Sequence, residues 1–136
     1  MIPPTKQDLE KLCHHSQIYF AVFCAKQVFH LVEPKHQPVC RNAIDIAKLF
    51  IEGKATQEEC RVAAYAANTA YADADAAYAT AYAADAADAA AYAAYAADAA
   101  AAASAAKDKT KIIEAQWEYY KELLAFETIV EDILLA

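Results

Sequence analysis

The sequence predicts an all-α fold: one compact domain, residues 1–136, built as a bundle of about five helices. Alanine supplies 29 of the 45 residues from Val62 to Ala106, and alanine favours the helix most because its side chain loses no entropy on ordering. One glycine and four prolines are too few turn residues for an all-β fold. Elsewhere, apolar residues recur three and four positions apart, as on one face of a helix.

The first predicted helix covers residues 6–32. Thr5 and Asp8 have the spacing of a capping box, which satisfies backbone N–H groups at a helix start. The apolar residues that follow occupy much of the helix circumference, so we expect this helix to lie at the centre of the bundle. Glu33 precedes Pro34, and a residue before proline avoids helical backbone angles, so the helix should end there.

Two shorter helices are predicted next, at residues 39–52 and 57–72. Gly53, the only glycine, directly follows the apolar stripe of the first, where a left-handed C-terminal cap is expected. Thr56 and Glu59 have the spacing of a second capping box, which marks the start of the other helix.

The fourth and fifth helices are predicted at residues 75–106 and 110–135. A single helix joining the third and fourth would be about 75 Å long at ~1.5 Å per residue, too long for a domain of this size. Polar residues between Asn68 and Asp75 compete for backbone hydrogen bonds, so we place the break there. We expect an alanine-rich, closely packed helix pair, covered by the large apolar residues of the fifth helix.

The net charge of −7 arises entirely in the second half of the chain. Residues 1–61 are nearly neutral, residues 62–106 carry five aspartates and no basic residue, and residues 107–136 carry seven acidic and four basic residues. Such an acidic surface repels DNA and RNA and suits a basic partner instead. The alternative interpretation is that the aspartates only keep an alanine-rich helix in solution.

The sequence carries no catalytic or metal-binding motif. His14 and His15 are adjacent and so point to different faces of a helix, and His36 and Cys40 lack a second ligand pair at the spacing of a zinc site. No glycine-rich loop is present that could hold a phosphate. We therefore expect no enzyme activity, no metal and no cofactor.

The expected compartment is the cytoplasm. No run of ~18 large apolar residues predicts a membrane span, and the N-terminus lacks the basic start and apolar core of a secretory signal. Without export, cysteines are expected to be reduced and buried rather than bridged. The four cysteines are Cys13, Cys24, Cys40 and Cys60.

Most other residues of the alanine-rich segment are tyrosine or aspartate, and many of the tyrosines have an aspartate within one helical turn. A tyrosine on an alanine helix offers a large apolar body and a hydroxyl tip, which is the profile of an interface anchor. In the structural alternative, the rings fill gaps between alanine helices and the aspartates are solvated. The candidate partner-binding residues are Tyr78, Tyr82, Asp85, Asp88, Tyr92 and Tyr95.

Three motifs occur in a recognisable order. Residues 20–28 read aromatic-Ala-x-x-Cys-Ala-x-x-Val, residues 36–53 form a proline-containing loop, an arginine and an Ala-Ile helix ending in glycine, and residues 114–117 read Glu-x-x-Trp. This order resembles a family of bacterial immunity proteins that accompany polymorphic toxins or bacteriocins. The chain has tyrosines and aspartates where family members carry histidines, and it lacks their proline or glycine between the third and fourth helices. No toxin-binding residue therefore carries over.

The resemblance implies a non-enzymatic protein that neutralises a cognate toxin by binding it. The tyrosines would anchor the partner, and the aspartates would steer a basic target. A second hypothesis is a structural protein that forms a homodimer through its alanine-rich helices, and a third is a small helical metal protein or enzyme. Thr69 and Thr80 lie eleven residues apart, which resembles helical antifreeze proteins, but residues 91 and 102 are alanine and end the series.

Overall fold

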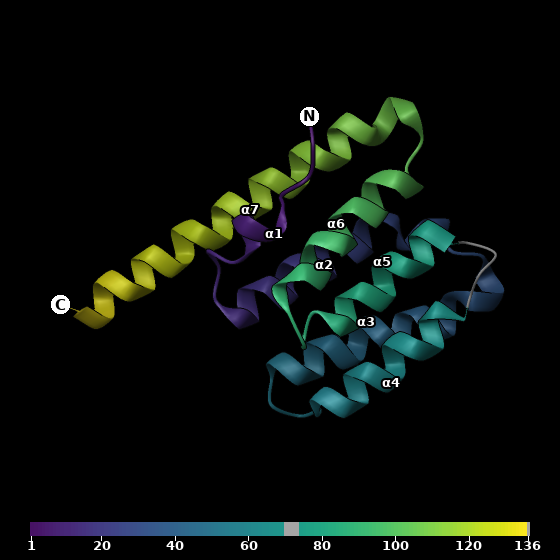
Figure 1. Ribbon diagram of the computed structural model, residues 1–136, viewed down its shortest axis with the longest axis horizontal. Coiled ribbons are helices and arrows are strands. Elements are labelled where there is room, and N and C mark those ends of the chain that lie inside the picture. The colour runs from purple at the N-terminus through teal and green to yellow at the C-terminus, as the bar shows by residue number, and fades with distance from the viewer. Residues whose placement is uncertain (70–73, 136) are drawn as a thin grey trace.

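The computed structural model describes residues 1–69 and 74–135, and all regular secondary structure within them is helical (Figure 1). The all-α fold is confirmed, but the prediction of about five helices is wrong, because the described residues contain seven α-helices and two short 3-10 helices. The elements are α1 (Lys6–Leu9), α2 (His14–Val28), η1 (Phe29–Leu31), η2 (Pro34–His36), α3 (Gln37–Ile51), α4 (Gln57–Asn68), α5 (Ala74–Asp85), α6 (Ala90–Ala103) and α7 (Ala106–Leu135).

The predicted helix at residues 6–32 is divided, because the chain turns between α1 and α2. The side-chain amide of Gln17 donates hydrogen bonds to the carbonyl oxygens of Leu9 and Leu12, both at 3.0 Å. These bonds tie the turn to α2, and both leucines are buried in the core. At its other end α2 passes into η1, and Val32 is extended, close to the predicted end.

The predicted helix at residues 75–106 is also divided, into α5 and α6, by a reversal at residues 86–89. Ala89 is extended, with φ −162° and ψ 151°. Residues of α4 hold the reversal: the Gln57 side-chain amide donates to the Ala87 carbonyl oxygen at 2.9 Å, and Arg61 Nη2 lies 3.5 Å from Asp88 Oδ1. Folding back lets both helices bury alanine faces that one long helix would leave in water.

The remaining boundaries differ from the prediction by a few residues. α3 begins two residues earlier than expected, and α4 ends at Asn68. The predicted last residue of the third helix, residue 72, lies outside the described residues. α7 begins at Ala106 rather than residue 110, because Ser104 is extended and its hydroxyl donates to the Ala101 carbonyl oxygen at 2.8 Å.

The predicted helix caps are confirmed. Thr5 and Asp8 form a reciprocal capping box at the start of α1, and Thr56 and Glu59 form another at the start of α4. Gly53 adopts φ 76° after α3, a left-handed conformation that a residue with a Cβ seldom adopts. These three sites depend on neighbouring residues only, which is why the sequence alone identifies them.

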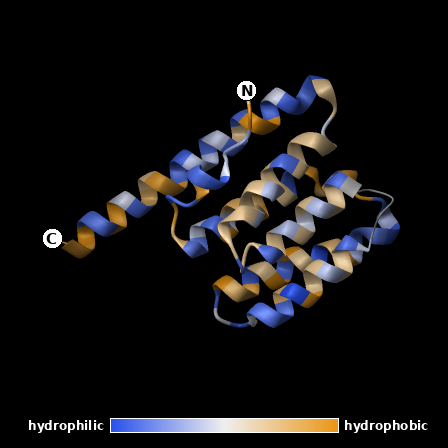
Figure 2. Cartoon of the chain, viewed as in Figure 1, coloured by the Kyte–Doolittle hydropathy of each residue, from blue (hydrophilic) through white to orange (hydrophobic). Residues whose placement is uncertain are grey.

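The core combines a few large side chains with many alanines. α2 is central, as predicted, and contacts α3, α5, α6 and α7. Its Ile18 and Phe20 are fully buried. α5 and α6, both inside the predicted fourth helix, pack extensively against each other through small side chains. Figure 2 shows these two helices in the tan of alanine along most of their length.

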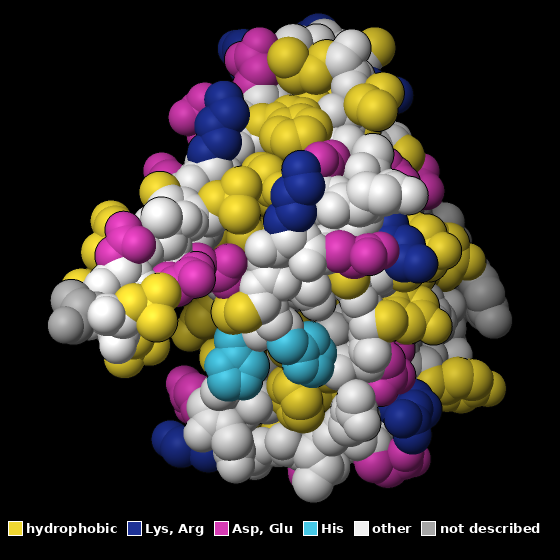
Figure 3. Space-filling model, turned by 60° about the vertical axis from the view of Figure 1, so that its left-hand side comes forward, with side chains coloured by type: hydrophobic (Ala, Val, Ile, Leu, Met, Phe, Trp, Pro, Cys, Tyr) yellow, Lys and Arg dark blue, Asp and Glu magenta, His cyan; other side chains and the backbone are white. Residues whose placement is uncertain are grey.

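α7 covers one side of the body with its first half and projects beyond it with its second (Figure 1). Ile113, Gln116 and Tyr120 are buried, whereas Phe126 and Ile133 are 63% and 67% exposed. The projecting end displays apolar and acidic side chains (Figure 3). None of the described helices combines the length and the apolar character that crossing a bilayer requires.

Candidate protein-binding site

Four of the six predicted site residues form one group of rings on α5 and α6, here called the tyrosine cluster: Tyr78, Tyr82, Tyr92 and Tyr95. Tyr82 is its centre, with its ring centroid 6.2 Å from that of Tyr78 and 5.5 Å from that of Tyr95. Tyr92 completes the cluster, 6.3 Å from Tyr82 and 5.8 Å from Tyr95. The reversal between α5 and α6 brings together rings that the sequence places up to 17 positions apart.

The ring bodies pack on alanine while the hydroxyl tips stay unbonded. Tyr95 is 48% exposed, and the other three rings are partly buried against the core. Within the described part of the chain, none of the four hydroxyls forms a hydrogen bond, whereas the Tyr120 hydroxyl donates to the Asp8 carbonyl oxygen at 2.8 Å. Burial raises the pKa of Tyr82, as do the neighbouring Tyr78 and Asp85, so its phenol stays a neutral donor at physiological pH.

Asp85 lies beside the cluster, and its carboxyl group loses part of its negative charge in mild acid. It is the last residue of α5 and is half-buried. Burial, followed by the nearby charge of Asp88, raises the pKa of Asp85 to about 6, and Arg61 opposes the rise. A carboxylate that protonates near pH 6 is a weak source of electrostatic steering in mild acid.

Asp88 faces α4 rather than the rings. Its Oδ1 lies 3.5 Å from Arg61 Nη2, and Arg61 also forms an ion pair with Glu58. Arg61 therefore offsets part of the charge of Asp88. The structure brings the four predicted tyrosines together, places Asp85 next to them, and directs Asp88 away.

Two aspartates that the prediction omitted adjoin the cluster. Asp75 on α5 and Asp98 on α6 line a shallow hollow of about 260 Å³ together with Tyr78, Tyr82 and Tyr95. Burial raises the pKa of Asp98. Each aspartate lies three residues from a tyrosine of its own helix, and this spacing could have identified both as neighbours of the rings from the sequence. Only the pairing of α5 with α6 reveals that both face one hollow.

The residues considered for other chemistry are not gathered into a site. Within residues 1–69 and 74–135, no three His, Cys, Asp or Glu side chains come close enough to hold a metal ion. His14 contacts the ring of Phe50 edge-on at 5.9 Å. Thr80 is fully buried and its hydroxyl donates to the Ala77 carbonyl oxygen, so it cannot contribute to an ice-binding face.

Cysteine exposure differs from the prediction at one position. None of the four cysteines forms a disulfide, as expected, and Cys24, Cys40 and Cys60 are buried. Cys13 is exposed, because it precedes α2 at the turn that divides the predicted first helix.

The fold and this face define an all-α helical protein with a partly exposed tyrosine cluster flanked by aspartates. No family model, curated protein or solved structure matches the chain.

Proposed function

We propose that the protein is a non-enzymatic binding protein that holds a basic partner protein against the tyrosine cluster. One observation carries the proposal: four phenol rings gather at one place, and their hydroxyls bond to nothing within the described residues. Tyrosines with apolar bodies and available polar tips are typical anchors of protein interfaces. A tyrosine with a purely structural role resembles Tyr120, whose hydroxyl is bonded inside the fold.

Asp75 and Asp98 give the cluster its preference for a basic partner. Among the residues that the structure describes, no lysine or arginine lines the hollow that they share with the tyrosines. A lysine or arginine of a partner would pair with these carboxylates, and an arginine would also stack on the rings. Asp85 and Asp88 contribute less to this preference than the sequence indicated, because one protonates near pH 6 and the other pairs with Arg61.

The family resemblance of the sequence extends this proposal to an immunity protein. In that role the protein would act in the cytoplasm and neutralise a cognate toxin by covering a basic surface of it. Neutralisation by binding needs no catalytic group, so shape, aromatic anchors and charge complementarity suffice.

A homodimer through the alanine-rich helices has less support. Most alanines of α5 and α6 are already buried inside one chain; Ala83 and Ala97, for example, are both 0% exposed. A second copy would find few of these side chains at the surface.

The test is affinity capture from a lysate of the native host with two matched variants. Tyr95→Lys places a positive charge in the cluster, at a side chain that is 48% exposed. Tyr65→Lys makes the same change on α4, at a tyrosine that is 75% exposed and outside the cluster. Circular dichroism checks that both variants keep the helical fold.

We expect the wild type and Tyr65→Lys to retain one near-stoichiometric basic protein that Tyr95→Lys loses. Binding of the purified partner should weaken by about 30-fold or more, the size of an interface hot spot. Equal retention by Tyr95→Lys, or capture of the protein alone, would count against the proposal.

A further inference from the structure

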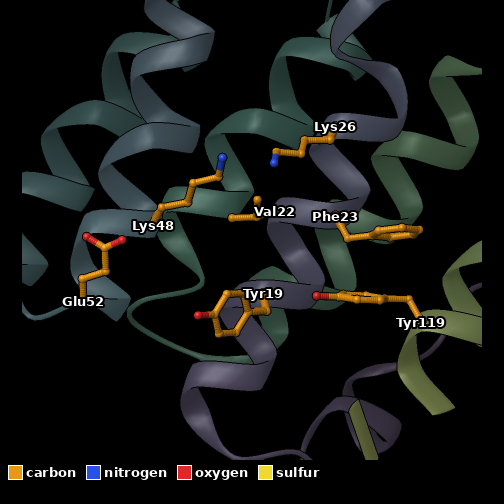
Figure 4. A pocket seen from close by; sticks show the side chains of 7 residues that line it. All are labelled: Tyr19, Val22, Phe23, Lys26, Lys48, Glu52 and Tyr119. Atoms are coloured by element: carbon orange, nitrogen blue, oxygen red, sulfur yellow. The ribbon is translucent and has the colours of Figure 1, made fainter. Parts of the chain in front are cut away.

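A second hollow lies on another part of the molecule, between α2, α3 and α7 (Figure 4). Its volume is about 280 Å³, roughly nine times the ~30 Å³ that one water molecule occupies in the liquid. That is room for a small ligand only. It shares no residue with the tyrosine cluster, so it is independent of the proposed function.

Two lysines from different helices point toward each other across this hollow (Figure 4). Lys26 comes from α2 and Lys48 from α3. The nearby Lys48 side chain, followed by burial, lowers the pKa of Lys26, and Asp45 opposes this more weakly. Two ammonium groups held together repel each other, and an anion between them would relieve that repulsion.

The acidic residues nearby do not neutralise the pair. Among the described ion pairs, none joins Lys26 or Lys48 to a carboxylate within 4.0 Å. Glu52 lines the same hollow one turn after Lys48, yet it pairs with Lys54 at 3.5 Å instead. In a chain with 19 acidic and 12 basic residues, two neighbouring lysines with no described carboxylate within 4.0 Å would be stabilised by an anionic ligand.

The other walls of the hollow are aromatic. Phe23 and Tyr119 stack on each other with ring centroids 4.5 Å apart and planes inclined by 19°, so ring edges and the Tyr119 hydroxyl border the hollow (Figure 4). Tyr19 stands on the other side, below the lysines in Figure 4. A planar apolar group could lie against these rings while an acidic group reaches the two ammonium groups.

We propose that this hollow binds a small aromatic anion, whose carboxylate or phosphate group bridges Lys26 and Lys48 and whose ring lies against the edges of the Phe23 and Tyr119 rings. The lysines supply two charge-assisted hydrogen bonds. The aromatic walls supply apolar contact, and Val22 lines the same space. The phosphate ester and the carboxylate share this chemistry, so separate probes must distinguish them.

The test is a titration of the full-length protein followed by NMR, with benzoate and phenyl phosphate as probes. Benzyl alcohol controls for the ring without the charge, and inorganic phosphate controls for the charge without the ring. We expect one or both aromatic anions to shift the NMR signals of Lys26, Lys48, Phe23 and Tyr119. The affinity of the anion should weaken as the salt concentration increases. Inorganic phosphate and benzyl alcohol should each bind at least about tenfold more weakly than the aromatic anion.

Substitutions of the lysines separate a built site from general attraction of anions. Lys26→Gln and Lys48→Gln should each weaken binding of the aromatic anion about tenfold to hundredfold. Lys35→Gln removes the same charge from an exposed side chain whose ion-pair partner, Glu33, does not line the hollow, and it should leave binding unchanged. Lys48→Gln should also return the pKa of Lys26 toward its ordinary value, which NMR measures without any ligand.

Three results would overturn the proposal. They are equal binding of inorganic phosphate and phenyl phosphate, equal loss of affinity in Lys35→Gln, and no shift of the four signals with either aromatic anion. None of these bears on the tyrosine cluster, so the two proposals fail separately.

Discussion

Replacing Asp85 with asparagine should stabilise the protein at neutral pH, and the gain should fade in mild acid. Asp85 is half-buried at the last position of α5, and Asp88 follows three residues later. Burial and that neighbouring charge raise the pKa of Asp85 to about 6, and Arg61 only partly offsets them. A carboxylate at this end also opposes the helix dipole, whereas a neutral amide does not.

The magnitude follows from the two pKa values of Asp85. Unfolding returns the carboxyl group to its ordinary pKa of 3.8, so between pH 3.8 and about 6 the folded state binds more protons than the unfolded state. The free energy of unfolding therefore rises as the pH falls through this window. Above the window, the ionised Asp85 carboxylate lowers the stability by its full amount. A fully buried carboxyl group with this shift would lose about 3 kcal/mol. Because Asp85 is only half-buried and solvent screens it, we expect about 1–2 kcal/mol.

The assay is urea unfolding of the wild type and Asp85→Asn at several pH values from 4 to 8. At pH 7 the variant should gain about 1–2 kcal/mol in the free energy of unfolding, equivalent to a rise in melting temperature of about 3–8 °C. At pH 4 most of the difference should be gone.

A matched control removes the same charge three residues later. Asp88 is exposed, and Asp88→Asn removes both its pair with Arg61 and its repulsion of Asp85. Because these two effects oppose each other, the free energy of unfolding should change by no more than about 0.5 kcal/mol at pH 7. Equal stability of Asp85→Asn and the wild type at pH 7, or a difference that persists unchanged at pH 4, would refute the reasoning.

Three further predictions test caps, packing and thiols. Thr56→Ala removes the α4 capping box. It should lower the free energy of unfolding, measured in urea, by about 1 kcal/mol. A change below about 0.3 kcal/mol would show that the cap is dispensable. Ala83→Leu adds volume at a fully buried position of α5 and should destabilise the fold by about 1–3 kcal/mol, measured by thermal unfolding; no loss of stability would contradict close packing there. Cys13 should be the only thiol that reacts rapidly with a disulfide reagent in the native protein, because the other cysteines are buried and burial raises the pKa of two of them, Cys24 and Cys60. Rapid reaction of a second thiol would contradict this.

Local signals allowed part of the fold to be predicted. The capping boxes at Thr5 and Thr56 and the left-handed Gly53 depend on residues within one turn, and all three are confirmed. The reversals at residues 10–13 and 86–89 are stabilised by the side chains of Gln17 and Gln57, which reach across from other helices. No local pattern indicates those contacts, so two helices were predicted where four exist.

In the candidate site, too, local features could be predicted from the sequence, whereas contacts between helices could not. Tyr78 and Tyr82 could be grouped from their spacing on one helix, as could Tyr92 and Tyr95. Their union into one cluster requires α5 and α6 to run antiparallel, and so does the approach of Asp75 to Asp98. The hollow between α2, α3 and α7 could not be predicted from residue spacing in the sequence, because Lys26 and Lys48 belong to different helices.

The projecting half of α7 has a consequence for hydrogen exchange. The Glu127 side chain accepts a hydrogen bond from the Cys13 backbone N–H at 2.7 Å, and beyond it residues 128–135 are exposed on every side of the helix. A segment this short is barely stable as an isolated helix, since fewer than about 12–15 residues rarely sustain one in water. Amide protons near Tyr120 should therefore exchange only when the whole protein unfolds, whereas those near Leu135 should exchange almost as fast as in an unfolded peptide, giving one continuous helix a graded local stability.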